Sequence, residues 1–331
     1  MTQSEQNGPA GVGESRRLST WLIWLALAAA LIVAAFLLPW GQVWAALARA
    51  DGAWIAAAFA ICLAAMPVAA ALWWLFLPRQ YRLGWSRVFE ITSLTVMARA
   101  TLPFFAGDAS AIGLLVMRGG LNPGAAVLVL TLDQLFTGLG KLAMICAVLS
   151  FGALPPALVA AGTSVMVLVL CFSAAMIIAA VYGHALHGLA EKFPARLQMM
   201  IRKISDLTAH LEMLRDPSRT TAALILTLIR KSIEVGVTLA VQHAVGLDLP
   251  LWNAILLVAV LDLAAVIPGP PAGLGVFEAA GLFTYHYLGV PPGIGFAAAM
   301  LQHAVYLGND FLYGYGVLLL EGIRRKARGK A

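Results

Sequence analysis

Long apolar stretches alternate with short polar ones along most of the chain. A bilayer core about 30 Å thick is crossed by about 20 apolar helical residues. Six stretches reach that length: residues 18–38, 53–77, 124–150, 154–182, 222–245 and 294–320. Pro67 lies inside the second stretch and is expected to kink it. The pattern therefore predicts six full membrane crossings.

Two further apolar stretches are interrupted. The interruptions are Pro103, Gly107 and Asp108 within residues 88–117, and the run Pro268–Gly275 within residues 252–288. Proline removes a backbone donor, and glycine tolerates irregular dihedral angles. Irregular backbone at membrane depth is tolerated only where protein or a wet cavity surrounds it. We therefore expect both interruptions to lie inside the protein.

The distribution of Lys and Arg indicates the orientation of the spans. Most of the 22 basic residues fall in the N-terminal tail and in residues 79–87, 192–219 and 324–330. Short basic segments stay on the cytoplasmic side of a membrane. Counting crossings then requires residues 88–117 to begin and end inside, and residues 252–288 to begin and end outside. Each is either a re-entrant hairpin or two tightly packed spans, and the two enter from opposite sides.

The domain organisation follows from the same pattern. The polar residues 1–17 are typical of a disordered tail. Residues 184–217 carry apolar side chains at helical spacing on one face and charges on the other, which predicts an amphipathic helix at the membrane surface. Its two interpretations are a plain connector and a lipid sensor. The prediction is a single transmembrane domain, residues 18–320, with halves 18–183 and 221–320, followed by a basic cytoplasmic tail, 321–331.

The two interrupted segments resemble each other. Gly120 precedes Asp133 by 13 residues, and Gly289 precedes Gln302 by 13 residues. Together with entry from opposite sides, this indicates an inverted repeat, an arrangement in which transporters bind substrate at broken helices near the bilayer midplane. The alternative is a chance similarity between two helices broken by Gly and Pro.

Several ionisable residues fall inside the apolar stretches, where each costs about 2.5–3.5 kcal/mol on insertion scales. They are Arg99, Asp108, Asp133, Lys141, Asp262, Glu278 and Asp310. Asp108 is expected to pair with Arg99 across the hairpin tip or with Lys141. Asp133 and Lys141, two helical turns apart, are alternatively a structural ion pair.

Glu278 is expected in the first turn of the helix that leaves the second interruption. There the helix dipole favours a carboxylate, so its role is either that of a cap or part of a site. Arg118 and Arg230 lie near predicted span ends, where their side chains can reach the interface.

Composition supports a membrane protein and excludes several other classes. The chain is 61% hydrophobic and 11% charged, against about 45–50% and about 25% in soluble domains. The three cysteines form no CxxC or Cys/His cluster, and no two of His243, His286 and His303 have metal-ligand spacing. Nucleotide-binding and hydrolase motifs are absent. The net charge of +6 is explained by the basic segments that set the topology, so we expect no nucleic-acid partner. Because the motifs and ligand spacings above are absent, we also expect no cofactor, no metal and no catalytic residue.

Two motifs resemble the signatures of the lysylphosphatidylglycerol synthase transmembrane-region family. The first is Leu102-Pro103…Ala106-Gly107-Asp108, then Arg118-Gly119-Gly120, then Asp133-Gln134. The second, more specific one is Ile267-Pro268…Ala272-Gly273-Leu274-Gly275-Val276-Phe277-Glu278, then Leu288-Gly289-Val290-Pro291. The resemblance covers roughly residues 18–320.

The resemblance implies a flippase-like protein that translocates lipids, or assists translocation, in the bacterial cytoplasmic membrane. The distribution of Lys and Arg predicts that both termini are cytoplasmic. Lysine transfer is not expected, because the soluble transferase domain found in some members is not seen. The implied partner is a membrane lipid (phospholipid, hopanoid or polyprenyl-linked), besides a second copy or a lipid-synthesis enzyme. The candidate site residues are Arg99, Pro103, Gly107, Asp108, Arg118, Asp133, Lys141, Pro268, Gly273, Gly275 and Glu278.

The chain departs from the family pattern at two cationic positions. The family usually has an arginine shortly after the Gly-Asp pair and another beside the acidic residue of the next helix, where this chain has Ala111 or a near neighbour and Gln134. Arg99, Arg118 and Lys141 are the candidates to replace them. Two other functions stay open: a membrane enzyme acting on a lipid-linked sugar or isoprenoid, and a non-transporting accessory protein of a hopanoid or glycolipid pathway.

Overall fold

The computed structural model describes residues 36, 38–102, 106–151, 156–190, 212–266 and 270–328. The structure is 85% helix, and the described residues contain no strand, which confirms the predicted all-α membrane bundle. The first predicted span, the N-terminal tail and most of the predicted amphipathic helix lie outside the described residues. So do Pro103 and Pro268.

The second predicted span forms two consecutive helices, α3 (Gly52–Leu63) and α4 (Ala65–Phe76), preceded by the short helix α2 (Trp40–Ala48). The helix is interrupted at Ala64, next to Leu63. A proline ring clashes with the carbonyl four residues earlier, which for Pro67 is that of Leu63. The helix is therefore interrupted where Pro67 is expected to disturb it, and proline geometry explains the position of this interruption.

The first interrupted segment forms a helical hairpin of α5 (Trp85–Thr101) and α6 (Ala106–Met117). Its outer ends lie together, because the Arg87 Nε donates to the carbonyl of Arg118 at 3.0 Å. The 12 residues of α6 extend only about 18 Å, too short to cross a bilayer. Of the two arrangements expected, the structure shows the re-entrant hairpin.

The second interrupted segment is also a hairpin, formed by α12 (Leu251–Ala264), the short 3₁₀ turn η1 (Pro271–Gly273) and α13 (Val276–Tyr287). Trp252 at the start of α12 and Leu288 just after α13 pack against the same apolar cluster. The two outer ends of this hairpin therefore also lie together.

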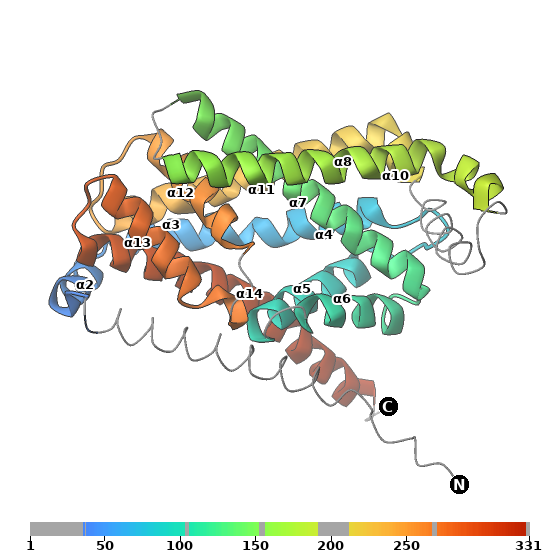
Figure 1. The fold of residues 1–331 in the computed structure, drawn as a ribbon. Coiled ribbons are helices and arrows are strands. Elements are labelled where there is room, and N and C mark those ends of the chain that lie inside the picture. The colour runs from blue at the N-terminus through green and yellow to red at the C-terminus, as the bar shows by residue number, and fades with distance from the viewer. Residues whose placement is uncertain are drawn as a thin grey trace, which may run out of the picture.

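The hairpins enter the bundle from opposite ends, as predicted. Helix α11 (Pro217–Ala244) runs antiparallel to α3–α4. At one end the amide of Asp51 donates to the carbonyl of Ala244 at 2.8 Å; at the other, Arg79 pairs with Asp216 at 2.9 Å. Since α5 follows α4 and α12 follows α11, the first hairpin opens at the Arg79 end and the second at the Asp51 end (Figure 1).

The two halves repeat the same elements in opposite directions. Asp51 caps α3 and Asp216 caps α11, and α6 and α13 both have 12 residues. A glycine with positive φ, Gly120 (φ 68) or Gly289 (φ 78), then precedes the long helices. These are α7 (Pro123–Phe151) and α14 (Pro292–Arg328). The predicted inverted repeat is therefore present in the order and direction of the helices.

The remaining helices complete the bundle. Helix α8 (Pro156–Ala190) packs against α7, and the short α10 (Glu212–Arg215) precedes α11. Among the residues that the structure describes, three candidate spans have the length and apolar composition to cross a membrane: Gly52–Phe76, Pro123–Ser150 and Leu158–Met176. Helices α11 and α14, with 28 and 37 residues, are long enough but carry charged residues along their length.

Candidate functional site

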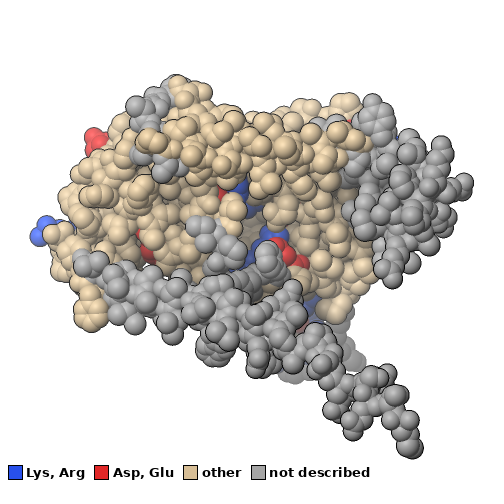
Figure 2. All heavy atoms as spheres, in the orientation of Figure 1, with Lys and Arg blue, Asp and Glu red and all other residues tan. Residues whose placement is uncertain are grey.

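Charged side chains gather where the tips of the two hairpins meet, and we call this region the polar centre. The turn η1 of the second hairpin packs against α5 of the first. Figure 2 shows basic and acidic side chains in a hollow near the middle of a mostly uncharged face, with a few further charged side chains toward its left side. Charges at this depth are tolerated only where they pair or meet water, so the hollow is the natural candidate for a site.

At the first hairpin, Arg99 of α5 joins carboxylates from two other helices. Its guanidinium lies 2.8 Å from Asp108 Oδ1 on α6 and 3.4 Å from Asp133 Oδ2 on α7. The Arg99 and Asp108 side chains are 31% and 42% exposed, whereas Asp133 is 6% exposed. The predicted pairing of Asp108 with Arg99 is therefore confirmed, and both members of that pair are partly exposed.

Gly107 explains how the hairpin closes so tightly. A Cβ atom at this position would lie 2.8 Å from both Cα and Cγ of Arg99. Contacts that short do not occur without movement of the backbone, so only glycine lets α6 approach α5 here. In the motif Gly107-Asp108, the glycine lets α6 approach α5 closely, and this approach places the Asp108 carboxylate beside Arg99.

Asp133 and Lys141 do not form the structural ion pair that their spacing allowed. Eight residues of helix separate them by about 12 Å along the axis, and they turn to different neighbours. Asp133 meets Arg99 of α5, while the Lys141 Nζ donates to the carbonyl of Asp262 on α12 at 3.1 Å. The alternative pairing of Lys141 with Asp108 is likewise not observed.

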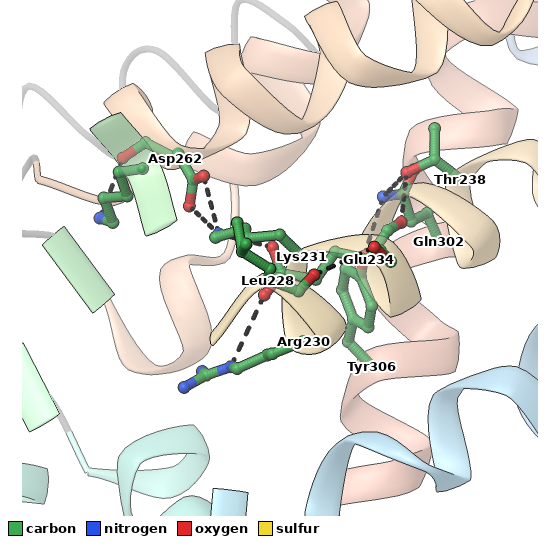
Figure 3. A network of polar contacts seen from close by, with 10 residues as sticks. Leu228, Arg230, Lys231, Glu234, Thr238, Asp262, Gln302 and Tyr306 are labelled. Carbon is green, nitrogen blue, oxygen red and sulfur yellow. Dashed lines mark hydrogen bonds and ion pairs between the residues drawn. The ribbon is translucent and has the colours of Figure 1, made fainter. Parts of the chain in front are cut away.

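The middle of the polar centre is organised around Lys231 of α11 (Figure 3). Its Nζ lies 2.9 and 2.8 Å from the two carboxylate oxygens of Asp262 and 2.7 Å from Glu234 Oε2. The Lys231 side chain is only 5% exposed. A buried ammonium of this kind is stable because two carboxylates compensate for its lost hydration.

Sequence reasoning missed part of this group. Asp262 was expected among the charges at membrane depth, but Lys231 and Glu234 were not, although they lie at i and i+3 inside a predicted span. Counting every charge in residues 222–245 would have found them. The expectation for Arg230 was wrong: α11 begins at Pro217, so Arg230 lies halfway along the helix, where its Nε is 3.7 Å from Glu234 Oε1.

The two charged groups are neighbours in space. Asp133 from the first group and Arg230 and Lys231 from the second line one small cavity, with Leu72, Phe136, Thr137 and Thr227. The two groups together contain four basic side chains and four carboxylates: Arg99, Lys141, Arg230 and Lys231, and Asp108, Asp133, Glu234 and Asp262. Three of the basic side chains pair with carboxylates, while Lys141 donates to the backbone carbonyl of Asp262. The polar centre is therefore a balanced network that spans both halves of the repeat.

The second hairpin holds its carboxylate differently. Glu278 Oε2 accepts from the amide of Gly275 at 2.7 Å, and Oε1 lies 2.6 Å from His303 Nδ1. The other ring nitrogen of His303 is 3.1 Å from the carbonyl of Ala272. Glu278 therefore caps its helix, which is one of the two roles expected for it. It also anchors the turn to α14 through His303.

The glycines of the second motif provide backbone geometry. Gly273 and Gly275 have φ of 73° and 84°, and Ala272 between Pro271 and Gly273 has φ of 58°. The first two values suit glycine, while a residue with a Cβ pays for the left-handed conformation at Ala272. This turn is consequently shaped by its backbone rather than by side-chain charge.

Arg118 lies apart from the polar centre. It pairs with Glu321 at the outer end of the first hairpin. Of the other predicted residues, Arg99, Gly107, Asp108 and Asp133 come together at the first tip, and Gly273, Gly275 and Glu278 at the second. Within the described ranges, no group of three or more His, Cys, Asp or Glu side chains could hold a metal ion.

Comparison with known proteins adds one finding. The family model described as "Lysylphosphatidylglycerol synthase TM region" matches residues 23–314, most of the chain. The matched range contains both hairpins and the whole polar centre. No curated protein and no solved structure matched.

Proposed function

Because the chain belongs to the lysylphosphatidylglycerol synthase TM region family and is an integral membrane protein, we propose that it translocates lipids between the leaflets of the bacterial cytoplasmic membrane. The observation that carries this proposal is the polar centre between two re-entrant hairpins that enter from opposite ends. Broken helices of an inverted repeat near the bilayer midplane are where secondary transporters bind their substrates.

The arrangement suits a lipid because it divides polar from apolar surface. A headgroup that crosses hydrocarbon alone loses its hydration, and charged groups in a hollow can replace that hydration. The outer face of the bundle suits acyl chains, since α8 exposes Val167, Leu168, Leu170 and Phe172. A lipid can thus keep its tails in the bilayer while its headgroup passes through the polar centre.

The accessible ion pair of the first hairpin is the proposed headgroup contact. Arg99 holds both Asp108 and the buried Asp133, so an anionic headgroup that reaches Arg99 can displace Asp108 while Asp133 stays in place. The guanidinium fork makes bidentate contacts with phosphate or carboxylate oxygens. Asp108, once released, can accept from a hydroxyl or ammonium group of the same headgroup.

The proposed orientation places the Arg79 end of the bundle in the cytoplasm. The loop between α4 and α5, the start of α11 and the last turns of α14 all carry arginines at that end. Positive residues at short loops remain cytoplasmic. Both termini are then cytoplasmic, and a lipid-synthesis enzyme or a second copy of the chain remains a proposed partner.

Sealed vesicles test the proposal directly. The full chain is reconstituted into phosphatidylcholine vesicles with a trace of headgroup-labelled phosphatidylglycerol, and an impermeant quencher reports the outward-facing fraction over time. We expect the protected half of the label to become accessible in protein-containing vesicles and to stay protected in empty ones.

Matched carboxylate variants give the control. Asp108→Asn removes a charge from the polar centre, whereas Asp51→Asn removes one from an exposed cap at the bundle end, where Asn still caps. Asp51→Asn should scramble the label like the unaltered protein, and Asp108→Asn should slow the exchange at least about tenfold, as loss of one charge-assisted contact implies. Lipids of every tested headgroup keeping their sidedness would refute the proposal.

A further inference from the structure

A second polar pocket lies at the outer end of the first hairpin, away from the polar centre. Its volume is about 410 Å³, and its walls come from α5, the end of α6 and the last turns of α14. We call it the arginine pocket, after its lining residues: Arg87, Glu90, Arg118, Glu321, Arg324 and Arg325.

Two glutamates hold the arginines in position. Glu90 is 2.9 Å from Arg87 and 3.5 Å from Arg324, and Glu321 pairs with Arg118. The Glu90 and Glu321 side chains are 18% and 20% exposed, against 45% for Arg87 and 67% for Arg324. The carboxylates therefore lie deeper than these two guanidinium groups, which remain reachable by a ligand.

The pocket has more positive than negative charge. Four arginines meet two glutamates, and Arg325 has no ion pair with any residue that the structure describes. Arginines that serve only as a topology signal have no reason to converge on one concavity. Arg82 and Lys326, at the same end of the bundle, do not line it. Guanidinium forks that converge suit the oxygens of a phosphate group.

The location of the arginine pocket indicates that the phosphate belongs to a lipid headgroup. The pocket lies among helix ends at the end of the bundle that carries most of the described arginines, and basic pockets of this kind between membrane helices bind lipid headgroups. Helix α5 connects it with the polar centre, since Arg87 and Arg99 are twelve residues apart on the same helix. That separation is about 18 Å, so a headgroup moving along α5 would pass from one to the other.

We propose that the arginine pocket binds the phosphate group of an anionic membrane lipid at the bundle end and presents that lipid to the polar centre. The presenting role rests on the proposed lipid translocation, whereas binding does not. The substrate class that follows is a lipid whose headgroup carries a phosphate with net negative charge.

Lipid binding to the full chain tests the pocket. The protein is placed in phosphatidylcholine nanodiscs with increasing phosphatidylglycerol, and native mass spectrometry counts the lipid retained. The double variant Arg324→Gln with Arg325→Gln should weaken retention at least about tenfold, as the loss of charge-assisted contacts implies. The control Arg82→Gln with Lys326→Gln removes the same charge at the same end and should retain the lipid within twofold of the unaltered chain, because neither residue lines the pocket.

The outcomes separate the pocket from the wider proposal. Equal weakening by both double variants would show that only general surface charge matters and would overturn the pocket. Equally effective competition by free inorganic phosphate would overturn the assignment to a lipid. Retention that depends on Arg324 and Arg325, in a protein that moves no lipid in vesicles, would support the pocket while refuting translocation.

Discussion

The two hairpins have the same outline and use their carboxylates differently. In each, the acidic residue is the third residue of a 12-residue helix: Asp108 in α6 and Glu278 in α13. Asp108 reaches out to Arg99 and is 42% exposed. Glu278 turns back to cap its own helix, binds His303 and is 14% exposed. The first hairpin therefore holds an accessible ion pair, and the second a closed anchor.

The difference follows from what stands opposite each carboxylate. In the first half, Arg99 is the fifteenth residue of α5 and bridges to Asp133. In the second half, the fifteenth position counted from the start of α12 is Ala265, just after the helix ends, and its side chain is uncharged. Glu278 then pairs within its own half, with the turn and with α14. The first repeat therefore has a partly exposed ion pair, while the carboxylate of the second supports the turn η1, which packs against α5.

The largest effect is expected from Arg99→Ala. This change leaves Asp108 and the buried Asp133 without their shared cation, and breaking a buried ion pair costs about 3–5 kcal/mol. The free energy of unfolding in detergent, from circular dichroism with denaturant, should fall by that order. Arg82→Ala, in an exposed loop, should change it by less than about 0.5 kcal/mol. If the Arg99→Ala protein were as stable as the unaltered chain, the contacts of Arg99 with Asp108 and Asp133 would not stabilise the fold.

The next effect concerns the closure of the first hairpin. Gly107→Ala forces a methyl group against Arg99, and overpacking of this kind costs about 1–3 kcal/mol. Gly113→Ala, in the same helix with nothing within 4 Å of its added Cβ, should instead stabilise by about 0.5–1 kcal/mol through helix propensity. Thermal unfolding of both variants gives the comparison, and equal shifts would contradict the close approach.

A smaller loss is expected from Glu278→Gln in the second hairpin. The Gln oxygen can still cap the helix at Gly275, but the charge that faces His303 is gone, which should cost about 1–2 kcal/mol. Asp108→Asn should cost less than about 1 kcal/mol, since that side chain is 42% exposed and its partner Arg99 keeps Asp133. Chemical denaturation gives the loss in the free energy of unfolding for both variants. A larger loss for Asp108→Asn than for Glu278→Gln would mean that the anchor is not in the second hairpin.

The smallest effect is expected at the strained turn. Ala272→Gly relieves a φ of 58° and should stabilise the protein by about 0.5–1 kcal/mol. Ala279→Gly, exposed within α13, should destabilise it by about 0.5–1 kcal/mol because glycine loses more freedom in a helix. Opposite shifts of the two melting temperatures are the expected result. A lower melting temperature for both would show that the turn does not depend on this backbone conformation.

Periodicity and charge were enough to predict the architecture. The apolar stretches located most of the helices that the structure describes, Pro67 located the interruption at Ala64, and the distribution of Arg and Lys led to hairpins that enter from opposite ends. These inferences succeeded because membrane helices are fixed by hydrophobic length and by the satisfaction of backbone hydrogen bonds, both of which are local properties of the sequence.

The pairing inside the polar centre was harder to predict. Spacing along α7 allowed a pair of Asp133 with Lys141, but the rotation and neighbours of α7 send the two side chains to different helices. Lys231 and Glu234 lay in a span that looked ordinary, and their importance depends on Asp262 of another helix. Tertiary packing decides which charged side chains form contacts, and this packing cannot be deduced from the periodicity of a single helix.

The most direct test compares lipid exchange by Asp108→Asn and Glu278→Gln in the same vesicles, with each rate divided by the amount of folded protein. We predict at least about a tenfold loss per folded molecule for Asp108→Asn, from the missing charge-assisted contact, and a rate within twofold of the unaltered protein for Glu278→Gln. Exchange that is normal in Asp108→Asn and lost in folded Glu278→Gln would contradict this prediction, because the working charge would then lie in the second hairpin.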